Sequence, residues 1–284
     1  MFQLFLQRAP LTRWRLACAR LLSRIVRFFF RKPTYVIRRH GIVYEVDFTE
    51  GIDLSLFLFG GFQSHVLGKR VPALPKDATI IDVGANVGVM ALQFAAQVPH
   101  GRVFAFEPTQ YAFRKLQRNI ALNPLLATRI TVIQSFVTDT PGAHPTSVYS
   151  SWKVAGPSST GTHPLHGGSL HSAEGAGAIT IDQFVASQNI SRLSLIKIDT
   201  DGYELDVLRG ATETLQRLKP IIIAEVGLYI LKEHGATVAD FLRCLPGYVV
   251  SELRTGHIIT ADSAPRIIPA FSTVDCVAVP EKGR

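Results

Sequence analysis

A glycine-rich turn directly after a short apolar run is the feature that most restricts the fold of this 284-residue chain. The run and the turn read Ile80-Ile81-Asp82-Val83-Gly84-Ala85-Asn86-Val87-Gly88, and an apolar segment follows at 89–97. Glycine lets the backbone turn tightly and approach a ligand, and the first turn of a helix presents free N–H groups. We therefore expect a strand-to-helix turn at a ligand site, although a plain structural turn explains the same glycines. The G-x-x-x-G spacing differs from the G-x-G-x-x-G of dinucleotide-binding turns.

The rest of the chain alternates between short β-branched runs and helical segments. This pattern predicts an α/β fold, a Rossmann-like doubly wound and mostly parallel sheet with helices on both faces. The β-rich tail after Tyr248 predicts antiparallel strands at one edge. We expect strands at 79–83, 102–106, 130–136, 193–198 and 220–226, and helices at 89–97, 111–122, 204–218 and 237–245. A hairpin is expected at 35–48, and helical turns at 53–66.

The chain divides into three parts by composition. Residues 1–32 form a basic helical segment, 33–78 an extension, and 79–284 the main domain, in which 141–178 is a variable stretch rich in Gly, Ser, His and Pro. Three scattered cysteines lack the spacing of metal ligands, so neither a metal site nor a disulfide framework is expected, and a reducing, cytoplasmic location is favoured.

The net charge of +8 comes from the N-terminus. Residues 1–40 contain ten Arg and Lys and no acidic residue, which leaves 20 basic and 22 acidic residues for the rest. The body of the chain therefore lacks the excess positive charge of a nucleic-acid-binding domain, and we expect no nucleic-acid partner.

The basic segment forms an amphipathic helix when residues 11–31 are placed on helical periodicity. Five arginines lie along one stripe and apolar residues fall largely on the other side; the two sets are Arg13, Arg20, Arg24, Arg27, Arg31 and Trp14, Cys18, Leu21, Leu22, Ile25, Phe28, Phe29. The uncharged stretches are too short to span a bilayer. A helix at the inner surface of a membrane is one interpretation, and a cleaved organellar presequence or a helix packed on the domain are the others.

Polar residues follow several predicted strands, where ligands bind in a doubly wound sheet. Glu107 lies about 20 residues beyond the glycine turn, a position from which a carboxylate can bind ribose hydroxyls. The segment Lys197-Ile198-Asp199-Thr200-Asp201-Gly202-Tyr203-Glu204 carries three carboxylates and a lysine, and Glu225 follows the next strand. Such clustering indicates a site that handles protons or binds a polar substrate, although helix capping explains part of it.

These motifs together resemble those of the FkbM-type methyltransferases, from about residue 80 to residue 248. The resemblance rests on the turn at 81–88, on Phe106-Glu107-Pro108, on 196–211, and on Thr180-Ile181-Asp182 and Glu225. It implies a Rossmann-like methyltransferase that uses S-adenosylmethionine and methylates a hydroxyl, with sugars or natural products as acceptors. Where the family often has an aromatic-Glu pair, this chain has Phe62-Gln63.

The resemblance also implies roles for individual residues. Asp82, Gly84, Asn86 and Gly88 would bind the methionine part of the cofactor, Glu107 the ribose, and Ser135 and Phe136 the adenine. Asp199, Asp201 and Glu204 would face the transfer site, with Asp199 next to the cofactor as well. Lys197, Asp201 and His171 are expected to contact the acceptor.

Transfer to an alcohol requires alignment of the acceptor oxygen with the methyl group and removal of a proton. Candidate bases are Asp199, Glu204 and Glu225, ahead of the histidines of the variable stretch, which are His144, His163, His166 and His171. A nucleotide-dependent oxidoreductase and a non-catalytic protein that keeps the cofactor fold are the rival interpretations. A membrane-bound helix would suit a membrane-associated acceptor.

Overall fold

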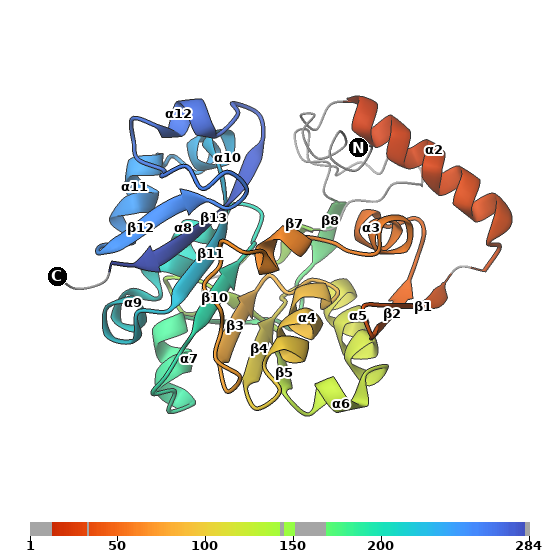
Figure 1. Cartoon of the computed structure of the whole chain (residues 1–284), viewed down its shortest axis with the longest axis horizontal. Helices are drawn as coiled ribbons and strands as arrows, with labels where there is room; N and C mark the ends of the chain where they lie inside the picture. Colours follow the sequence, from red (N-terminus) through yellow and green to blue (C-terminus); the bar gives the residue numbers. More distant parts are fainter. Residues whose placement is uncertain (1–12, 33, 143–144, 151–168, 282–284) are drawn as a thin grey trace.

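The computed structural model describes residues 13–32, 34–142, 145–150 and 169–281, and the side chains of 13–19, 64, 149, 150 and 169 are outside this description. His144, His163 and His166, considered above as bases, lie outside the described residues. A seven-stranded sheet in the order β12-β13-β11-β10-β3-β4-β5 forms the centre (Figure 1). Its strands are β3 (Thr79–Val83), β4 (Arg102–Phe106), β5 (Ile130–Ile133), β10 (Leu195–Ile198), β11 (Ile221–Gly227), β12 (Tyr248–Glu252) and β13 (Thr273–Pro280).

The sheet confirms the predicted Rossmann-like architecture. β11, β10, β3, β4 and β5 are mutually parallel, whereas β13 pairs antiparallel with both β11 and β12. The β-rich tail therefore extends one edge of the parallel sheet, as expected. β3 and β4 are buried on both faces except at Arg102, which explains their nearly continuous apolar sequences.

Helices cover both faces of this sheet. One face packs against α7 (Ile181–Ser187), α8 (Glu204–Arg209), α9 (Thr212–Leu218), α10 (Leu228–Glu233) and α11 (Val238–Arg243). The other packs against α3 (Gly51–Phe59), α4 (Val89–Gln97), α5 (Gln110–Ala121) and α6 (Pro124–Ala127). Alternate residues of one strand enter the two cores: Ile81 and Val83 join the first, and Ile80 joins the second. A short helix α12 (Ala264–Ile267) precedes β13.

Two predicted elements are divided in the structure. The run 130–136 forms β5 and a separate β6 (Ser135–Val137), which leaves the main sheet and pairs with β9 (Gly177–Ile179). The helix expected at 204–218 is interrupted at Gly210, where an added Cβ would lie 2.2 Å from the carbonyl oxygen of Thr138. Close approach of the two backbones therefore requires glycine at the end of α8. The described ends of the variable stretch form a hairpin of β7 (Ser147–Ser150) and β8 (Ser169–Ser172).

The N-terminal part packs on the second face. A hairpin of β1 (Tyr35–Arg39) and β2 (Ile42–Val46) precedes α3, and a short 3-10 helix η1 (Ser64–Leu67) follows it. The helix α2 (Arg13–Phe29) docks through Ser23, whose hydroxyl donates a 2.7 Å hydrogen bond to the carbonyl of Phe48, and through buried Val26. Within the described part of the chain, no helix is both long and apolar enough to cross a bilayer.

Candidate active site

The site lies where the connectivity of the sheet reverses. From β3 the chain adds β4 and β5 on one side, whereas β10, the other neighbour of β3, leads on to β11 on the opposite side. Ligands of doubly wound sheets bind outside the carboxyl ends of the strands at this reversal. Two hollows open there, a β4-side hollow and a β11-side hollow, and they share four lining residues, Gly84, Asn86, Asp199 and Asp201.

Gly84 lets the ends of β3 and β10 come together. Its φ is +77°, and an added Cβ would lie 1.8 Å from the carbonyl oxygen of Asp199. Gly88 begins α4 with a φ of +88°, and a Cβ there would lie 2.5 Å from the side chain of Leu116. Gly84 lines both hollows, whereas Gly88 is outside the described lining of either one because it faces α5.

Glu107 is fixed in a buried position at the end of β4. Its Oε1 accepts hydrogen bonds from the backbone N–H of Thr109 at 2.9 Å and from the Thr109 hydroxyl at 2.5 Å. Its Oε2 accepts from the backbone N–H of Asn86 at 2.9 Å. Burial raises the pKa of the carboxyl, while these donors act in the opposite direction. The carboxylate is thus oriented in part by the glycine turn itself, through the N–H of Asn86.

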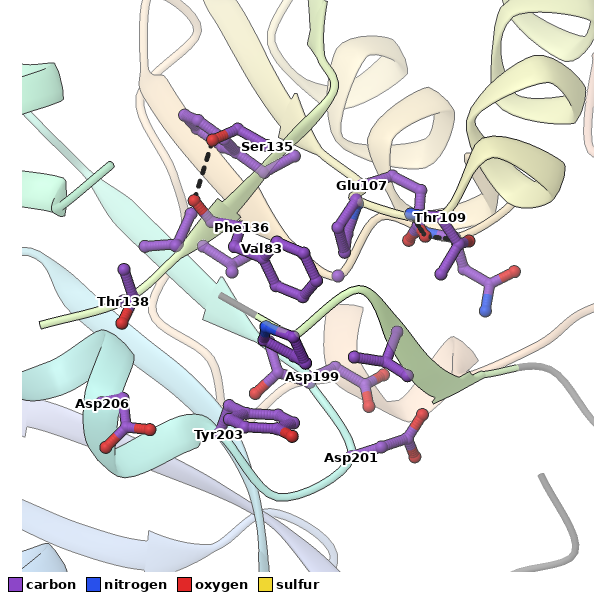
Figure 2. A pocket seen from close by; sticks show the side chains of 18 residues that line it. Val83, Glu107, Thr109, Ser135, Phe136, Thr138, Asp199, Asp201, Tyr203 and Asp206 are labelled. Atoms are coloured by element: carbon purple, nitrogen blue, oxygen red, sulfur yellow. Dashed lines mark hydrogen bonds between the residues drawn. The ribbon is translucent and has the colours of Figure 1, made fainter. Parts of the chain in front are cut away.

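The β4-side hollow has an apolar wall and an acidic edge (Figure 2). Phe136 and Ser135 from β6 lie with Val83 on one side, and Asp199 and Tyr203 lie across from them. The Ser135 hydroxyl donates to the carbonyl of Phe136 at 2.9 Å. A flat aromatic ligand can pack against such a wall, while Glu107 offers a polar group at one end. Ser135 and Phe136 thus line this hollow, and the adenine role that the family resemblance implies for them stays a prediction.

Lys197 links two carboxylates beneath the cleft. Its Nζ lies 3.2 Å from Oδ2 of Asp199 and 3.5 Å from Oδ1 of Asp82, and its side chain is 4% exposed. Asp82 is fully buried and does not belong to the described lining of either hollow. Burial raises the pKa of Asp82. For Lys197 the two carboxylates outweigh burial and raise its pKa, so the lysine stays charged.

Asp199 lies at the junction of the two hollows and has a second polar partner. Its Oδ2 accepts a 2.8 Å hydrogen bond from the side-chain amide of Gln63, which precedes η1. Burial acts to raise the pKa of Asp199, but Lys197, Gln63 and a hydrogen bond from Glu225 together lower it. Asp199 is therefore ionised near neutral pH.

Glu225 next to it has the opposite preference. Burial raises the pKa of Glu225 well above its ordinary value, and the negative charges of Asp199 and Asp275 add to this effect. The hydroxyl of Thr273 contacts its Oε1, and Asp275 faces it across the β11–β13 ladder. Asp275 in turn pairs with the ring of His65 on η1. The pKa values of two neighbouring carboxyl groups are thus shifted in opposite directions, a pattern typical of acid–base sites.

The other predicted site residues differ in placement. Asp201 lies exposed at the edge of both hollows, and its φ is +54°. Its pKa is raised because the surrounding protein desolvates the carboxyl and because nearby carboxylates repel its negative charge. Oε1 of Glu204 accepts hydrogen bonds from the backbone N–H of Thr200 at 2.9 Å and of Gly202 at 3.3 Å. Its carboxylate therefore holds the turn after β10. The capping interpretation is wrong in its details, because α8 begins after Tyr203 and has no side-chain cap. Glu204 is outside the described lining of both hollows.

His171 lies apart from the two hollows. Its ring stacks on Tyr111 of α5 with centroids 5.2 Å apart, and it is outside the described lining of either hollow.

Sequence reasoning missed two polar residues that orient the site, Thr109 and Thr273. Thr109 had a signal in its position two residues after Glu107, whereas Thr273 comes from an antiparallel strand that only the folded sheet brings close. Among the described residues, no group of three or more His, Cys, Asp and Glu is arranged to hold a metal ion.

The fold and the site define a Rossmann-like α/β protein with two joined hollows at the carboxyl ends of its strands, one with an apolar wall and the other lined by carboxylates. Comparison with known proteins identifies the class. The sequence model of the methyltransferase FkbM domain matches residues 82–249, more than half of the chain. The chain therefore belongs to the FkbM methyltransferase family, as its motifs predicted, and it is a methyltransferase whose methyl donor is S-adenosylmethionine.

Individual relatives are distant. Methyltransferase sdnD of Sordaria araneosa is 25% identical over 179 residues, which cover 54% of this chain and 67% of the relative. Hexuronic acid methyltransferase AglP of Haloferax volcanii is 28% identical over 153 residues, or 52% of this chain and 56% of the relative. A solved methyltransferase FkbM structure from Methylobacillus flagellatus KT aligns with 76% of this chain at 18% identity and a TM-score of 0.47. This chain spans 47% of that protein.

Proposed function

We propose that this methyltransferase transfers the methyl group to a hydroxyl of a sugar, a glycan or a natural-product-type acceptor. The observation that carries the proposal is the position of Asp199, a carboxylate with a lowered pKa where the two hollows meet, between Lys197 and Glu225, whose pKa is raised. One relative named above is a hexuronic acid methyltransferase, which supports a sugar-type acceptor.

The β4-side hollow suits the adenosine part of S-adenosylmethionine. Glu107 would accept hydrogen bonds from the ribose hydroxyls, and Phe136 and Ser135 would flank the adenine. The backbone of Gly84 and Asn86 would bind the methionine part, at the four-residue junction that leads into the other hollow. Asp82 and Gly88 would act indirectly, Asp82 by holding Lys197 and Gly88 by packing the helix that follows the turn.

The β11-side hollow suits the acceptor. When bound, S-adenosylmethionine supplies an electrophilic methyl group, so the protein has to orient an oxygen and accept its proton. Asp199 is our first choice for the base because it is ionised and anchored at a strand end. Glu225, whose raised pKa favours the protonated form, can donate a hydrogen bond to the acceptor or to Asp199. Lys197 keeps Asp199 charged and Asp201 contributes a polar edge for the acceptor.

In this proposal the remaining predicted residues, Glu204 and His171, hold other parts of the site in place and do not contact the reacting groups. Glu204 fixes the backbone turn that carries Asp199 and Asp201. His171 supports the β7–β8 hairpin beside the cleft through Tyr111. A polyanionic acceptor such as nucleic acid does not fit, because among the described lining residues Lys197 is the single cation and two carboxylates already occupy it.

Methyl transfer into cell-envelope fractions tests the proposal. Purified protein is incubated with these fractions and S-adenosylmethionine carrying a tritiated methyl group, and the labelled product is hydrolysed to identify the sugar. Asp199→Asn should abolish incorporation while retaining binding of S-adenosylhomocysteine. The control Asp262→Asn alters an exposed carboxylate elsewhere and should incorporate label at the wild-type rate. Full activity of Asp199→Asn would reject this residue as the base.

The location is part of the same proposal. The protein would be cytoplasmic and held peripherally at the inner face of the membrane by residues 11–31. If a chain without residues 1–32 still sedimented with membranes, this location would need a different explanation.

A further inference from the structure

The helix α2 divides into three faces rather than two. At 100° per residue, Leu22, Val26 and Phe30 share a face with Ser23, and this face docks on the domain. Val26 is 7% exposed, and the ring of Phe30 contacts the rings of Tyr35, Phe48 and Phe57 at 5.2 to 5.5 Å. The docked face thus joins the main core.

A second face is apolar and exposed. Leu21, Ile25, Phe28 and Phe29 lie together on it and are 58%, 47%, 71% and 73% exposed, respectively. The rings of Phe28 and Phe29 contact each other edge to face at 5.3 Å, but the domain leaves both uncovered. Large aromatic residues side by side on a surface mark a contact with a partner or a membrane.

The third face is basic. Arg20, Arg24 and Arg27 lie along it within about 60° of each other, Arg31 follows just after the end of the helix, and all four are exposed. None of them has an ion-pair partner among the residues that the structure describes. No acidic residue occurs anywhere in residues 1–40. An apolar stripe directly beside an uncompensated positive stripe is complementary to an anionic bilayer, whose headgroups lie next to its hydrocarbon.

We propose that this exposed face of α2 binds the surface of an anionic membrane while the opposite face remains docked on the catalytic domain. This specifies the peripheral location proposed above, and it does not depend on methyl transfer. Because Ser23 and Val26 hold α2 on the domain, the membrane and the cleft would keep a fixed relative orientation. Figure 1 shows α2 on the side toward which the carboxyl ends of the parallel strands point. α3, next to it, contributes Ile52 to the β11-side hollow. A lipid-linked acceptor would therefore reach the cleft from the membrane.

Sedimentation of the purified full chain with vesicles tests this surface. The probes are vesicles of phosphatidylcholine alone and of phosphatidylcholine with phosphatidylglycerol. We expect strong binding to the anionic vesicles, which weakens on going from about 0.1 M to about 1 M salt as the screening length falls from roughly 10 Å to roughly 3 Å. The double variant Phe28→Ser/Phe29→Ser should lower the partition coefficient by roughly tenfold or more.

The basic face is tested separately. Arg24→Gln/Arg27→Gln should lower partitioning to anionic vesicles by roughly 25-fold and leave any binding to phosphatidylcholine alone unchanged. Matched controls are Leu125→Ser, which removes a side chain that is 81% exposed on α6, and Arg217→Gln on α9; both should bind like the wild type.

Three results would overturn the proposal. The first is wild-type protein that does not bind anionic vesicles. The second is binding of Phe28→Ser/Phe29→Ser and Arg24→Gln/Arg27→Gln that equals that of the controls. The third is a wild-type dimer in analytical ultracentrifugation that Phe28→Ser/Phe29→Ser dissociates without any vesicle binding, which would assign this face to a second copy of the chain. Binding of S-adenosylhomocysteine should be the same in every variant, so a loss of membrane binding is separable from a failure of the methyltransferase assignment.

Discussion

Replacing Lys197 by methionine removes the cation that holds two carboxylates together beneath the cleft. Lys197 is 4% exposed, and Asp82, 3.5 Å away, is fully buried. Breaking a buried pair by removing one partner costs about 3–5 kcal/mol, because the remaining charge is left uncompensated. Asp199 is 23% exposed, so solvent screens its interaction with Lys197 and reduces what the loss of that interaction costs in stability. We therefore expect Lys197→Met to lose about 3 kcal/mol or more of unfolding free energy in urea.

The pH dependence and a second variant separate charge from packing. Without Lys197 the pKa of the folded-state Asp82 carboxyl rises further, and a carboxyl with a raised folded-state pKa favours the folded state more as the pH falls. The deficit of Lys197→Met should therefore shrink between pH 8 and pH 5. Lys197→Met/Asp82→Asn, which removes both buried charges, should regain most of the lost stability at pH 8. A deficit below about 1 kcal/mol, or one that does not change with pH, would refute this account.

Three further variants test other parts of the site. Glu107→Gln should weaken binding of S-adenosylmethionine by roughly 10- to 100-fold in calorimetry, because a hydrogen bond to a charged group contributes about 1.5–3 kcal/mol; unchanged affinity would remove Glu107 from the ribose site. Gly84→Ala should destabilise the fold by at least about 2 kcal/mol, since its Cβ would overlap the backbone of Asp199 at a positive φ; an unaltered melting temperature would contradict this. The wild-type folded state retains a proton on Glu225 that the unfolded chain releases above about pH 5, so the wild type loses up to about 1.4 kcal/mol of unfolding free energy per pH unit there. Glu225→Gln has no such proton, so its stability relative to the wild type should rise with pH. Parallel pH profiles of the two proteins would show that Glu225 titrates normally.

The sequence predicted the parts of the molecule that depend on local signals. Buried parallel strands need continuous apolar runs, so β3, β4 and β11 could be located within one residue of their observed bounds. The glycine turn and Glu107 were recognisable because they follow the adjacent strands β3 and β4, and an acidic residue about 20 residues beyond a glycine turn is typical of a ribose-binding site. The backbone N–H of Asn86 and the carboxylate of Glu107 do meet at that point.

Contacts between distant segments were not predictable in the same way. The run 130–136 has one continuous β pattern, but β6 separates from it because its partner β9 lies some forty residues further on. Glycine is needed at position 210, after the end of α8, because the backbone at Thr138 lies against it, and helix propensity gives no sign of this neighbour. Gln63 reaches Asp199 across 136 residues of sequence. An amide there was noted as a departure from the family pattern, but its hydrogen bond follows only from the fold.

The division of α2 into three faces also depends on contacts between segments that are distant in the sequence. Periodicity alone separates the arginines from the apolar residues, but it cannot tell which apolar residues pack on the protein. Because α2 docks through Ser23 and Val26, the apolar residues on that side of the helix pack on the domain, and Phe28 and Phe29 stay exposed.

Calorimetric titration with S-adenosylhomocysteine and with NADH tests the central claim most directly. The claim is that the cleft at the junction of β3 and β10 holds the methyl donor through Glu107 and the glycine turn. The wild type should bind S-adenosylhomocysteine at one site, Glu107→Gln should bind it more weakly, and neither should bind NADH. Binding of NADH without binding of S-adenosylhomocysteine would contradict the claim and assign the cleft to an oxidoreductase.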